Sequence, residues 1–457
     1  MPPSVALALY ILLLIGILRY AQAPEDAHTW TLWVPVIWIA ILVSRLPSQW
    51  LDINTGYAAD VIEEGNWLDR CVYVAVIVLA FQIVSARSVR WSGLLEGNYA
   101  LTLVIVYALL SVAWSDSPGI SFKRWFRDLG TYLIALVIVS DSRPAAAIGG
   151  VLRRVCYIFI PLSVVLIRYY PELGVTYDPW TGARAYQGAS LSKNGLGGLC
   201  LISGIFFVWD SVTRWPQRRD RRTRRTILFD LAFIGMTLWL LRLSDSATSK
   251  LCFLIGCIVI IGIHWRFRST RPLWLKIAIP ASICLYLALE SFFGLTDFIT
   301  SALGRDTTMT GRTEVWHAVI PFNPNPLLGA GYEAFWLGPR LRDLWAQFWW
   351  QPTQAHNGYV EVYLNLGLIG LFIVALFLFV GYRRIWATAK TSELVSFSLA
   401  VWIVMLLANV TESGVFKGPL WLFLLVNSLV VPVSISKAPQ FVYQNPDPST
   451  AGRRHQP

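Results

Sequence analysis

Residues 356–381 read HNGYVEVYLNLGLIGLFIVALFLFVG, and this stretch indicates the fold class most directly. From Leu364 onward it is almost entirely apolar, and a helix needs about 20 mostly apolar residues to cross a bilayer. The apolar run is continuous, so it lacks the alternation of polar and apolar residues that marks a membrane β-strand. The stretch therefore predicts a membrane-spanning α-helix.

The rest of the chain repeats this pattern. Of its 457 residues, 55% are hydrophobic and only 14% are charged, whereas soluble domains carry about 25% charged residues. Similar apolar windows lie near 4–19, 31–46, 71–86, 98–114, 129–141, 147–167, 194–212, 227–242, 247–265, 274–293, 394–411 and 417–435. We therefore predict an all-α, polytopic integral membrane helix bundle with 12–13 transmembrane helices.

The placement of arginine predicts the orientation of these helices. The stretch RWPQRRDRRTRRT at 214–226 holds seven Arg and one Asp, and short loops rich in Arg and Lys stay in the cytoplasm. Alternation from this anchor places 168–193, 294–355 and 412–416 on the outer, periplasmic side. The same bias accounts for most of the net charge of +11, so the sequence does not predict nucleic-acid binding.

The first apolar window leaves two alternatives open. Counting back from the arginine-rich loop gives 13 spans and an outer N-terminus. However, Ala21-Gln22-Ala23 follows that window and resembles a signal-peptidase site, although no Lys or Arg precedes the window. Cleavage there would leave 12 spans.

The outer segment 294–355 is long for a connection between two spans. We predict one integral membrane domain that is divided along the chain into an N-terminal bundle (1–293), a periplasmic loop (294–355), C-terminal transmembrane helices (356–435) and a cytoplasmic tail (436–457). Inside the loop, the sequence RLRDLWAQFWW places a set of apolar residues on one helical face, namely Leu341, Leu344, Trp345 and Phe348. This amphipathic pattern is typical of interfacial helices, which we therefore predict in the loop.

Polar residues mark the outer end of the helix that follows the loop. Asn357, Glu361 and Asn365 are spaced by four residues, so they form a stripe along one face of an otherwise apolar helix. Ionisable groups inside a span are costly and usually face a cavity or a partner, which makes them functional candidates. His356 lies at the mouth of this helix, where a plain solvated histidine is the alternative.

A second outer helix start lies at Ser192-Lys193-Asn194, followed by Gly195, Gly197 and Gly198. Free N–H groups at a helix N-terminus attract anions, and Lys193 would strengthen such a site. The alternative is a capped helix whose small residues pack against a neighbour.

Several cations lie on the outer side against the topological trend. They are Lys123, Arg124, Arg127, Arg184, Lys193, Arg312, Arg340 and Arg342. Arg and Lys in such positions indicate an anionic ligand such as a phosphate or diphosphate. For some of them the alternative is ordinary pairing with Asp116, Asp128 or Asp343.

Common catalytic motifs are missing from the sequence. It contains no D-x-D, H-E-x-x-H, G-x-x-x-x-G-K-[ST] or Cys/His cluster, so we predict neither a metal site nor a cofactor. A transporter or flippase of a lipid-linked glycan or small anion is the competing function class, since polar stripes and cationic funnels also serve substrate passage.

Four motifs together resemble the bacterial O-antigen ligase/polymerase superfamily, which includes O-antigen ligases, O-antigen polymerases and exopolysaccharide polymerases. They are S-K-N-G-L-G from Ser192, G-R-T-E-x-W from Gly311, N-P-L-L-G-x-G-Y from Asn325, and H-N-G-Y-x-E-x-x-x-x-L-G-x-x-G from His356. The resemblance covers about residues 184–370. The Lys193-Asn194 form is slightly closer to the exopolysaccharide-polymerase branch.

The resemblance implies a metal-independent, inverting glycosyltransferase of the bacterial inner membrane that acts on the periplasmic side. The donor would be a glycan on undecaprenyl diphosphate. The acceptor would be a sugar hydroxyl, either on lipid A–core in a ligase or on another lipid-linked glycan in a polymerase. Membrane lipids surround the protein in either case.

The resemblance also assigns roles by position. His356 matches the candidate general base, and Arg312 matches a diphosphate-binding arginine. Arg184 is a second candidate for the diphosphate, joined by Lys193 and Asn194 at their helix start. Glu361 or Glu314 could orient His356 or share its role, and Asn357 and Tyr359 are candidates for orienting the acceptor.

Overall fold

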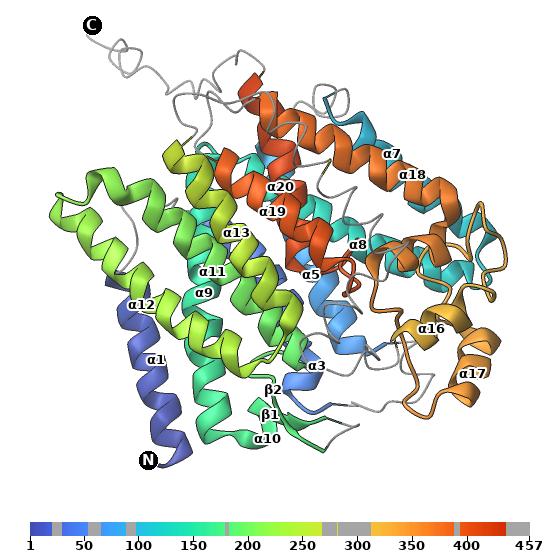
Figure 1. The fold of residues 1–457 in the computed structure, drawn as a ribbon, viewed down its shortest axis with the longest axis horizontal. Coiled ribbons are helices and arrows are strands. Elements are labelled where there is room, and N and C mark those ends of the chain that lie inside the picture. The colour runs from blue at the N-terminus through green and yellow to red at the C-terminus, as the bar shows by residue number, and fades with distance from the viewer. Residues whose placement is uncertain are drawn as a thin grey trace, which may run out of the picture.

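The computed structural model describes residues 1–20, 30–53, 65–87, 97–178, 182–266, 281, 312–387 and 394–435. Within these ranges the chain is a bundle of α-helices with one small two-stranded sheet (Figure 1). Apart from residue 281, the predicted span 274–293 lies outside the described residues, as do the Ala21-Gln22-Ala23 stretch and the tail 436–457.

The N-terminal half holds α1 (Pro3–Tyr20), η1 (Trp30–Leu32), α2 (Trp33–Val43), α3 (Pro47–Trp50), α5 (Trp67–Ala86), α7 (Tyr99–Leu110), η2 (Ser111–Trp114), α8 (Pro118–Val139), α9 (Pro144–Tyr169), α10 (Pro171–Gly174), β1 (Val175–Tyr177) and β2 (Arg184–Tyr186). It is followed by α11 (Lys193–Arg214), η3 (Trp215–Gln217), α12 (Arg221–Leu243), α13 (Ala247–Arg266), α16 (Arg312–Val319), α17 (Gly338–Gln347), α18 (Gly358–Ala387), α19 (Val395–Ala408) and α20 (Gly418–Ile435).

The all-α membrane fold is confirmed. Among the described residues, six helices are long and apolar enough to cross a membrane, namely α5, α9, α11 (with η3), α12, α13 and α18. Shorter apolar helices cover five further predicted windows, those of α1, α2, α7, α19 and α20. The protein is therefore a polytopic helix bundle, as its composition predicts.

One predicted boundary needs correction. The window 129–141 is the apolar end of α8, which begins eleven residues earlier, at Pro118. Proline is favoured in the first helical turn because the N–H group that it lacks would have no partner within the helix at that position. Lys123, Arg124 and Arg127 therefore lie on the first turns of a helix and not in a loop, and a search for apolar windows misses this polar helix end.

Hydrogen bonds between helix ends show that α2 and α5 run in opposite directions. At one end of α5, Arg87 donates to Thr31 at 2.8 Å and pairs with Asp141 at 3.2 Å. At the other end, the Ser48 hydroxyl donates to Asp69 at 2.6 Å. These two groups of contacts define two opposite faces of the bundle, as the arginine pattern predicts.

We call the face that carries Ser48, the β1–β2 hairpin and α17 the loop face. The hairpin belongs to it because Ser190, just after β2, donates to the carbonyl of Val43 at 2.8 Å. The opposite face carries η3 and residues 214–226, and we call it the arginine-rich face. In Figure 1 the hairpin, α16 and α17 lie towards the lower side of the view.

Helices from both ends of the chain share one hydrophobic core. In this core α11 packs against α12 and α13, α13 against α19, and α8 against α5 and α20. Buried residues from Ile17 to Leu429 belong to a single cluster. The helices that precede the 294–355 loop and those that follow it therefore form one packed body.

The loop has a small core of its own. Val315, Phe335 and Leu364 are buried together with Leu341 and Leu344 of α17. The sequence prediction of an amphipathic helix is confirmed, but its apolar face lies inside this core and not against lipid. Both leucines are 0% exposed, so the loop, rather than the bilayer, accounts for the amphipathic pattern.

The loop joins the bundle at a break in α18. Gly367 has φ 64° and ψ −166°, which interrupts the helix in its third turn. A side chain there would collide with the backbone of Leu327, because its Cβ would lie 2.2 Å from the Leu327 carbonyl. Loop and helix backbones hydrogen-bond across the break, from Ala330 N to Leu364 O at 2.9 Å and from Leu368 N to Pro326 O at 2.9 Å. Broken membrane helices of this kind often mark binding sites.

Candidate active site

His356 lies on the loop face, immediately before α18. Its backbone has a left-handed φ of 52°, which is uncommon for a residue other than glycine. The next residue, Asn357, caps the helix, since its Oδ1 accepts from the N–H groups of Tyr359 and Val360 at 3.0 and 3.1 Å. The imidazole is 30% exposed. The start of α18 thus holds the histidine at the edge of the bundle, within reach of a substrate.

Two residues from distant segments meet at this histidine. Glu412, from the turn between α19 and α20, places Oε2 3.8 Å from His356 Nδ1. Asn194, in the first turn of α11, donates from Nδ2 to Glu412 Oε1 at 2.8 Å. Three helices therefore bring a base, a carboxylate and an amide together.

Backbone contacts fix this arrangement. The Gly358 N–H is shared between the carbonyls of Asn409 and Glu412, at 2.8 and 3.1 Å. A Cβ on Gly358 would lie 2.1 Å from Asn409 Oδ1, so only glycine allows the turn to approach this closely. The 409–412 turn is consequently locked to the start of α18.

The Glu361 carboxylate is used differently from the sequence hypothesis. It accepts from Trp336 Nε1 at 3.1 Å and from the Ala355 N–H at 2.5 Å. Asn365 donates to it at 3.3 Å and accepts from the Phe335 N–H at 3.1 Å. The polar stripe on α18 therefore fastens the outer loop to the helix, and the carboxylate in ion-pair range of His356 is that of Glu412.

A group of cations surrounds Glu333, next to the contacts that Glu361 and Asn365 make with the outer loop. Lys417 pairs with the Glu333 carboxylate at 2.8 Å, and Arg124 donates to its backbone carbonyl at 2.6 Å. Burial alone would raise the pKa of Glu333, but the charges of Lys417, Arg127 and Arg124 outweigh this and hold the pKa below its ordinary value. The carboxylate is therefore ionised at neutral pH and holds the Lys417 ammonium group near the site.

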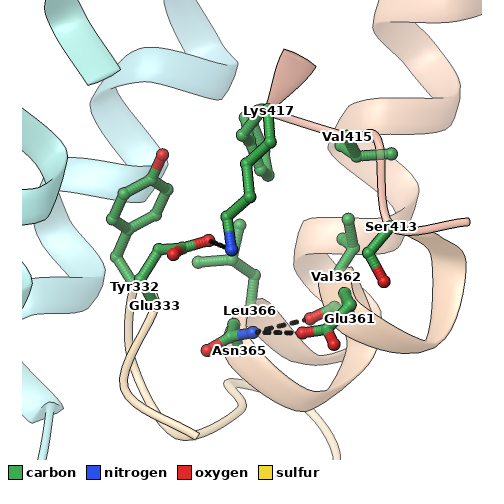
Figure 2. A pocket seen from close by; sticks show the side chains of 10 residues that line it. Tyr332, Glu333, Glu361, Val362, Asn365, Leu366, Ser413, Val415 and Lys417 are labelled. Carbon is green, nitrogen blue, oxygen red and sulfur yellow. Dashed lines mark hydrogen bonds and ion pairs between the residues drawn. The ribbon is translucent and has the colours of Figure 1, made fainter. Parts of the chain in front are cut away.

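Figure 2 shows a small pocket between Glu333, Glu361 and the 413–417 turn, with the Lys417 ammonium group reaching into it. Its volume is about 10 Å³, close to the minimum that one water molecule needs. Glu361 also binds the backbone next to His356, and Ser413 follows Glu412, so the pocket adjoins the histidine. As it stands, it has room for one water molecule or one hydroxyl group.

The cations singled out in the sequence are divided among several places. Lys193 pairs with Asp178 at 3.1 Å, and Arg340 pairs with Asp116 at 2.6 Å. Arg184 is exposed on β2. The backbone of Arg312 begins α16, while its side chain lies outside what the structure describes.

The structure also shows the exposure or the contacts of the remaining residues that the sequence singled out. Glu314 is exposed on α16. Tyr359 donates from its hydroxyl to the Leu406 carbonyl at 2.9 Å, which ties α18 to α19. Ser192 caps α11 by accepting from the Gly195 N–H at 3.0 Å. Gly197 packs on α13, where an added Cβ would lie 2.7 Å from Ser249 Oγ. The capped and closely packed helix start is thus confirmed, and Asn194 is committed to Glu412.

Sequence reasoning missed Glu412 and Lys417. Both belong to the short outer turn T-E-S-G-V-F-K between the last two helices. One acid and one base in so short an outer connection are a weak signal, and nothing in their spacing connects them to residues 194, 333 or 356. Their importance becomes visible only when the three segments meet.

Comparison with known proteins gives two findings. A family model described as O-antigen ligase matches residues 231–375, a range that includes Arg312, Glu314, His356 and Glu361. The chain is also 28% identical over 298 residues to the exopolysaccharide production protein ExoQ of Rhizobium meliloti (strain 1021). That match covers 62% of this chain and 65% of the relative, slightly less than two thirds of the relative's length.

Both findings agree with the motifs at 192–197, 311–316, 325–332 and 356–370 and with the polytopic helical fold. Together they support the assignment of the chain to the O-antigen ligase/polymerase superfamily.

Proposed function

We propose that this protein is a membrane glycosyltransferase that moves a glycan from undecaprenyl diphosphate to a sugar hydroxyl. The observation that carries the proposal is the meeting of His356, Glu412 and Asn194 at the start of a broken helix. A histidine that is partly exposed and faces a carboxylate is the usual form of a general base. The superfamily membership supports the choice of substrate.

The reaction needs one base and one anion site. The acceptor hydroxyl oxygen attacks C1 of the donor sugar and inverts its configuration. The bond between C1 and the diphosphate oxygen breaks, and its electron pair leaves with the diphosphate. The hydroxyl proton passes to Nε2 of His356, since a neutral imidazole can accept a proton at that nitrogen.

Arg312 and Arg184 are the proposed ligands of the diphosphate, assisted by Lys193 and Asn194 at the start of α11. Preorganised donors stabilise a leaving anion without proton transfer, and loss of one costs about 10²–10³ in rate by analogy with oxyanion donors. The described residues include no group of three or more His, Cys, Asp or Glu side chains arranged to hold a metal ion. We propose that the reaction is metal-independent.

We place the protein in the bacterial inner membrane with the loop face in the periplasm. The seven arginines of 214–226 lie on the opposite face, and such segments remain in the cytoplasm. Between a ligase and a polymerase we favour a polymerase, because the relative is an exopolysaccharide production protein. Its acceptor would then be a lipid-linked glycan and not lipid A–core.

A product assay tests the proposal. Purified protein is incubated in EDTA with a lipid-diphosphate-linked oligosaccharide, with and without lipid A–core, and the products are resolved on a gel. A ladder formed without lipid A–core is the expected result for a polymerase. One shifted band that requires lipid A–core would indicate a ligase. Loss of product that Mg²⁺ restores would contradict metal independence.

No product from an intact donor would contradict the glycosyltransferase proposal and favour a flippase or transporter. Arg312→Ala is the variant for the diphosphate site, and we expect it to lower transfer about 10²–10³-fold. Arg342→Ala is the matched control, since it removes an exposed arginine from α17. Equal activity of the two variants would argue against a diphosphate-binding role of Arg312.

A further inference from the structure

We propose that Glu412 is the positioning residue of the catalytic histidine and that Asn194 holds it in place. This inference rests on the proposed role of His356 as general base. Three side chains take part: the His356 imidazole faces the Glu412 carboxylate, and the Asn194 amide holds that carboxylate in place.

The first observation concerns the inner nitrogen of the ring. Nδ1 of His356 is buried and has no hydrogen-bond partner among the described residues. A buried polar atom without a partner is unfavourable, because it has lost its hydrogen bond to water without gaining another. Oε2 of Glu412 lies 3.8 Å from Nδ1, which is too far for a hydrogen bond. A small rotation of either side chain would bring the two atoms within hydrogen-bond distance. Catalytic hydrogen bonds are often long without substrate and shorten when it binds.

The second observation is that Glu412 is already held from two sides. Its Oε1 accepts from Asn194 Nδ2 at 2.8 Å, across 218 positions of sequence. Its backbone carbonyl accepts from the Gly358 N–H, two residues beyond the histidine. The carboxylate therefore keeps one oxygen on Asn194 and presents the other to the ring.

These contacts have a chemical consequence. A carboxylate that accepts from Nδ1–H selects the tautomer whose Nε2 carries the lone pair. The same carboxylate stabilises the imidazolium that forms when Nε2 takes the acceptor proton. Glu412 thus prepares the base and favours its charged product without contacting the substrate.

The other charged groups around the histidine are committed elsewhere. Glu361 binds Trp336 and the Ala355 N–H, and Glu333 pairs with Lys417. Among these acids, only Glu412 is in ion-pair range of the ring. The sequence had suggested Glu361 or Glu314 for this role, and the structure favours Glu412.

A spectroscopic test does not depend on the proposed reaction. The chain has five His, so ¹⁵N-histidine labelling gives a simple spectrum, and a His356→Ala sample assigns the signals of His356. At alkaline pH, where imidazole is neutral, we expect the Nδ1–H tautomer in the wild type. Glu412→Ala should shift the ring towards the Nε2–H tautomer. Identical His356 signals in both proteins would overturn the inference.

A kinetic test asks whether the position matters for transfer. We expect Glu412→Gln to lower kcat about tenfold or more with little change in KM, because a general base contributes about 10²–10⁴-fold in total. Glu412→Asp should recover part of the loss, and Asn194→Ala should lose only a few-fold, since it leaves the carboxylate in place. Asp343→Asn removes an exposed outer carboxylate from α17 and serves as the control.

In a double variant, Glu412→Gln should cost little once His356→Ala is present, because both act on one step. Full additivity would overturn the positioning role. If Glu412 sets the tautomer but no donor is consumed, the inference stands and the proposed function falls. If transfer occurs and all Glu412 variants match the control, the function stands and the inference falls.

Discussion

Two clusters of charged side chains in the same bundle differ in their exposure and in the distances between their charged atoms. On the loop face, His356 and Glu412 are 30% and 32% exposed, and their closest atoms are 3.8 Å apart. Deep between α9, α11 and α12, Arg153 is 2% exposed and pairs with Asp210 at 2.7 Å and with Asp230 at 2.8 Å. Arg214 adds a second bond to Asp210 at 2.9 Å.

The difference separates structure from chemistry. The inner cluster joins two arginines and two aspartates by ion pairs of 2.7–2.9 Å, so each of these four side chains has an oppositely charged partner. Buried ions need such pairing, because removing one partner exposes the full desolvation cost of the other. The outer cluster leaves a ring nitrogen of His356 without a hydrogen-bond partner among the described residues, and its imidazole is partly open to solvent. We infer that the first holds three helices together and that the second is kept ready for a substrate.

Removal of the base should give the largest effect. We expect His356→Ala to lower glycan transfer about 10²–10⁴-fold while the unfolding temperature in detergent stays near that of the wild type. The reason is that the ring makes no hydrogen bond with a described residue, so its removal takes no such bond from the folded state. Transfer within about tenfold of wild type would remove the histidine from the mechanism and weaken the contrast between the two clusters.

Removal of the inner arginine should act on stability instead. Arg153→Met leaves Asp210 with one partner and Asp230 without its ion pair, which costs about 3–5 kcal/mol in a buried site. We expect little folded protein by size-exclusion chromatography. Arg218→Met, on the exposed arginine-rich loop, is the control. If the two variants behaved alike, the inner cluster would have no role in holding the helices.

Glu361 tests a position between these extremes. Glu361→Gln puts a donor amide opposite the Trp336 and Ala355 N–H groups, so we expect a loss of about 1–3 kcal/mol from the loop attachment. Hydrogen exchange should then increase over 326–356 and transfer should fall with it. Unchanged protection together with abolished transfer would instead make Glu361 a catalytic group.

The smallest effect is expected at Glu333 and depends on pH. Its pKa is lowered in the folded protein, so its contribution to stability is complete above about pH 4.3 and is lost as pH falls through the folded-state pKa. Glu333→Gln should lower the unfolding temperature at neutral pH and flatten its decline in acid. Glu172→Gln, exposed on α10, is the control. An equally steep acid decline in Glu333→Gln would assign that decline to other carboxylates.

Sequence reasoning was accurate for features that depend only on residues close together in the chain. The capping by Ser192 and the stripe of Glu361 and Asn365 depend on neighbouring residues, and the structure shows both. The apolar windows depend on neighbouring residues too, and the structure confirms those that fall on described residues, with 129–141 extended back to Pro118. The role of the stripe was harder to predict. Its carboxylate turns to Trp336, which is 25 positions away, and no helical periodicity encodes that contact.

Long-range contacts also decided the loop. The amphipathic pattern of α17 is the same whether its apolar face meets lipid or protein. Leu341 and Leu344 turn inward because Phe335 and Leu364 offer them a dry surface. Likewise, Gly367 reads as one small residue in an apolar helix, and only the approach of Leu327 shows why the helix breaks there.

The sequence by itself determined that this protein is a helical membrane bundle and which superfamily motifs it carries, and it predicts which way its helices run. Hydrophobic length, arginine placement and local spacing suffice for these features, because each depends on a single segment and its solvent. Only the tertiary structure decided the composition of the candidate site. Asn194, His356 and Glu412 start or connect different helices, and the packing of those helices brings their side chains to within bonding or ion-pair distance.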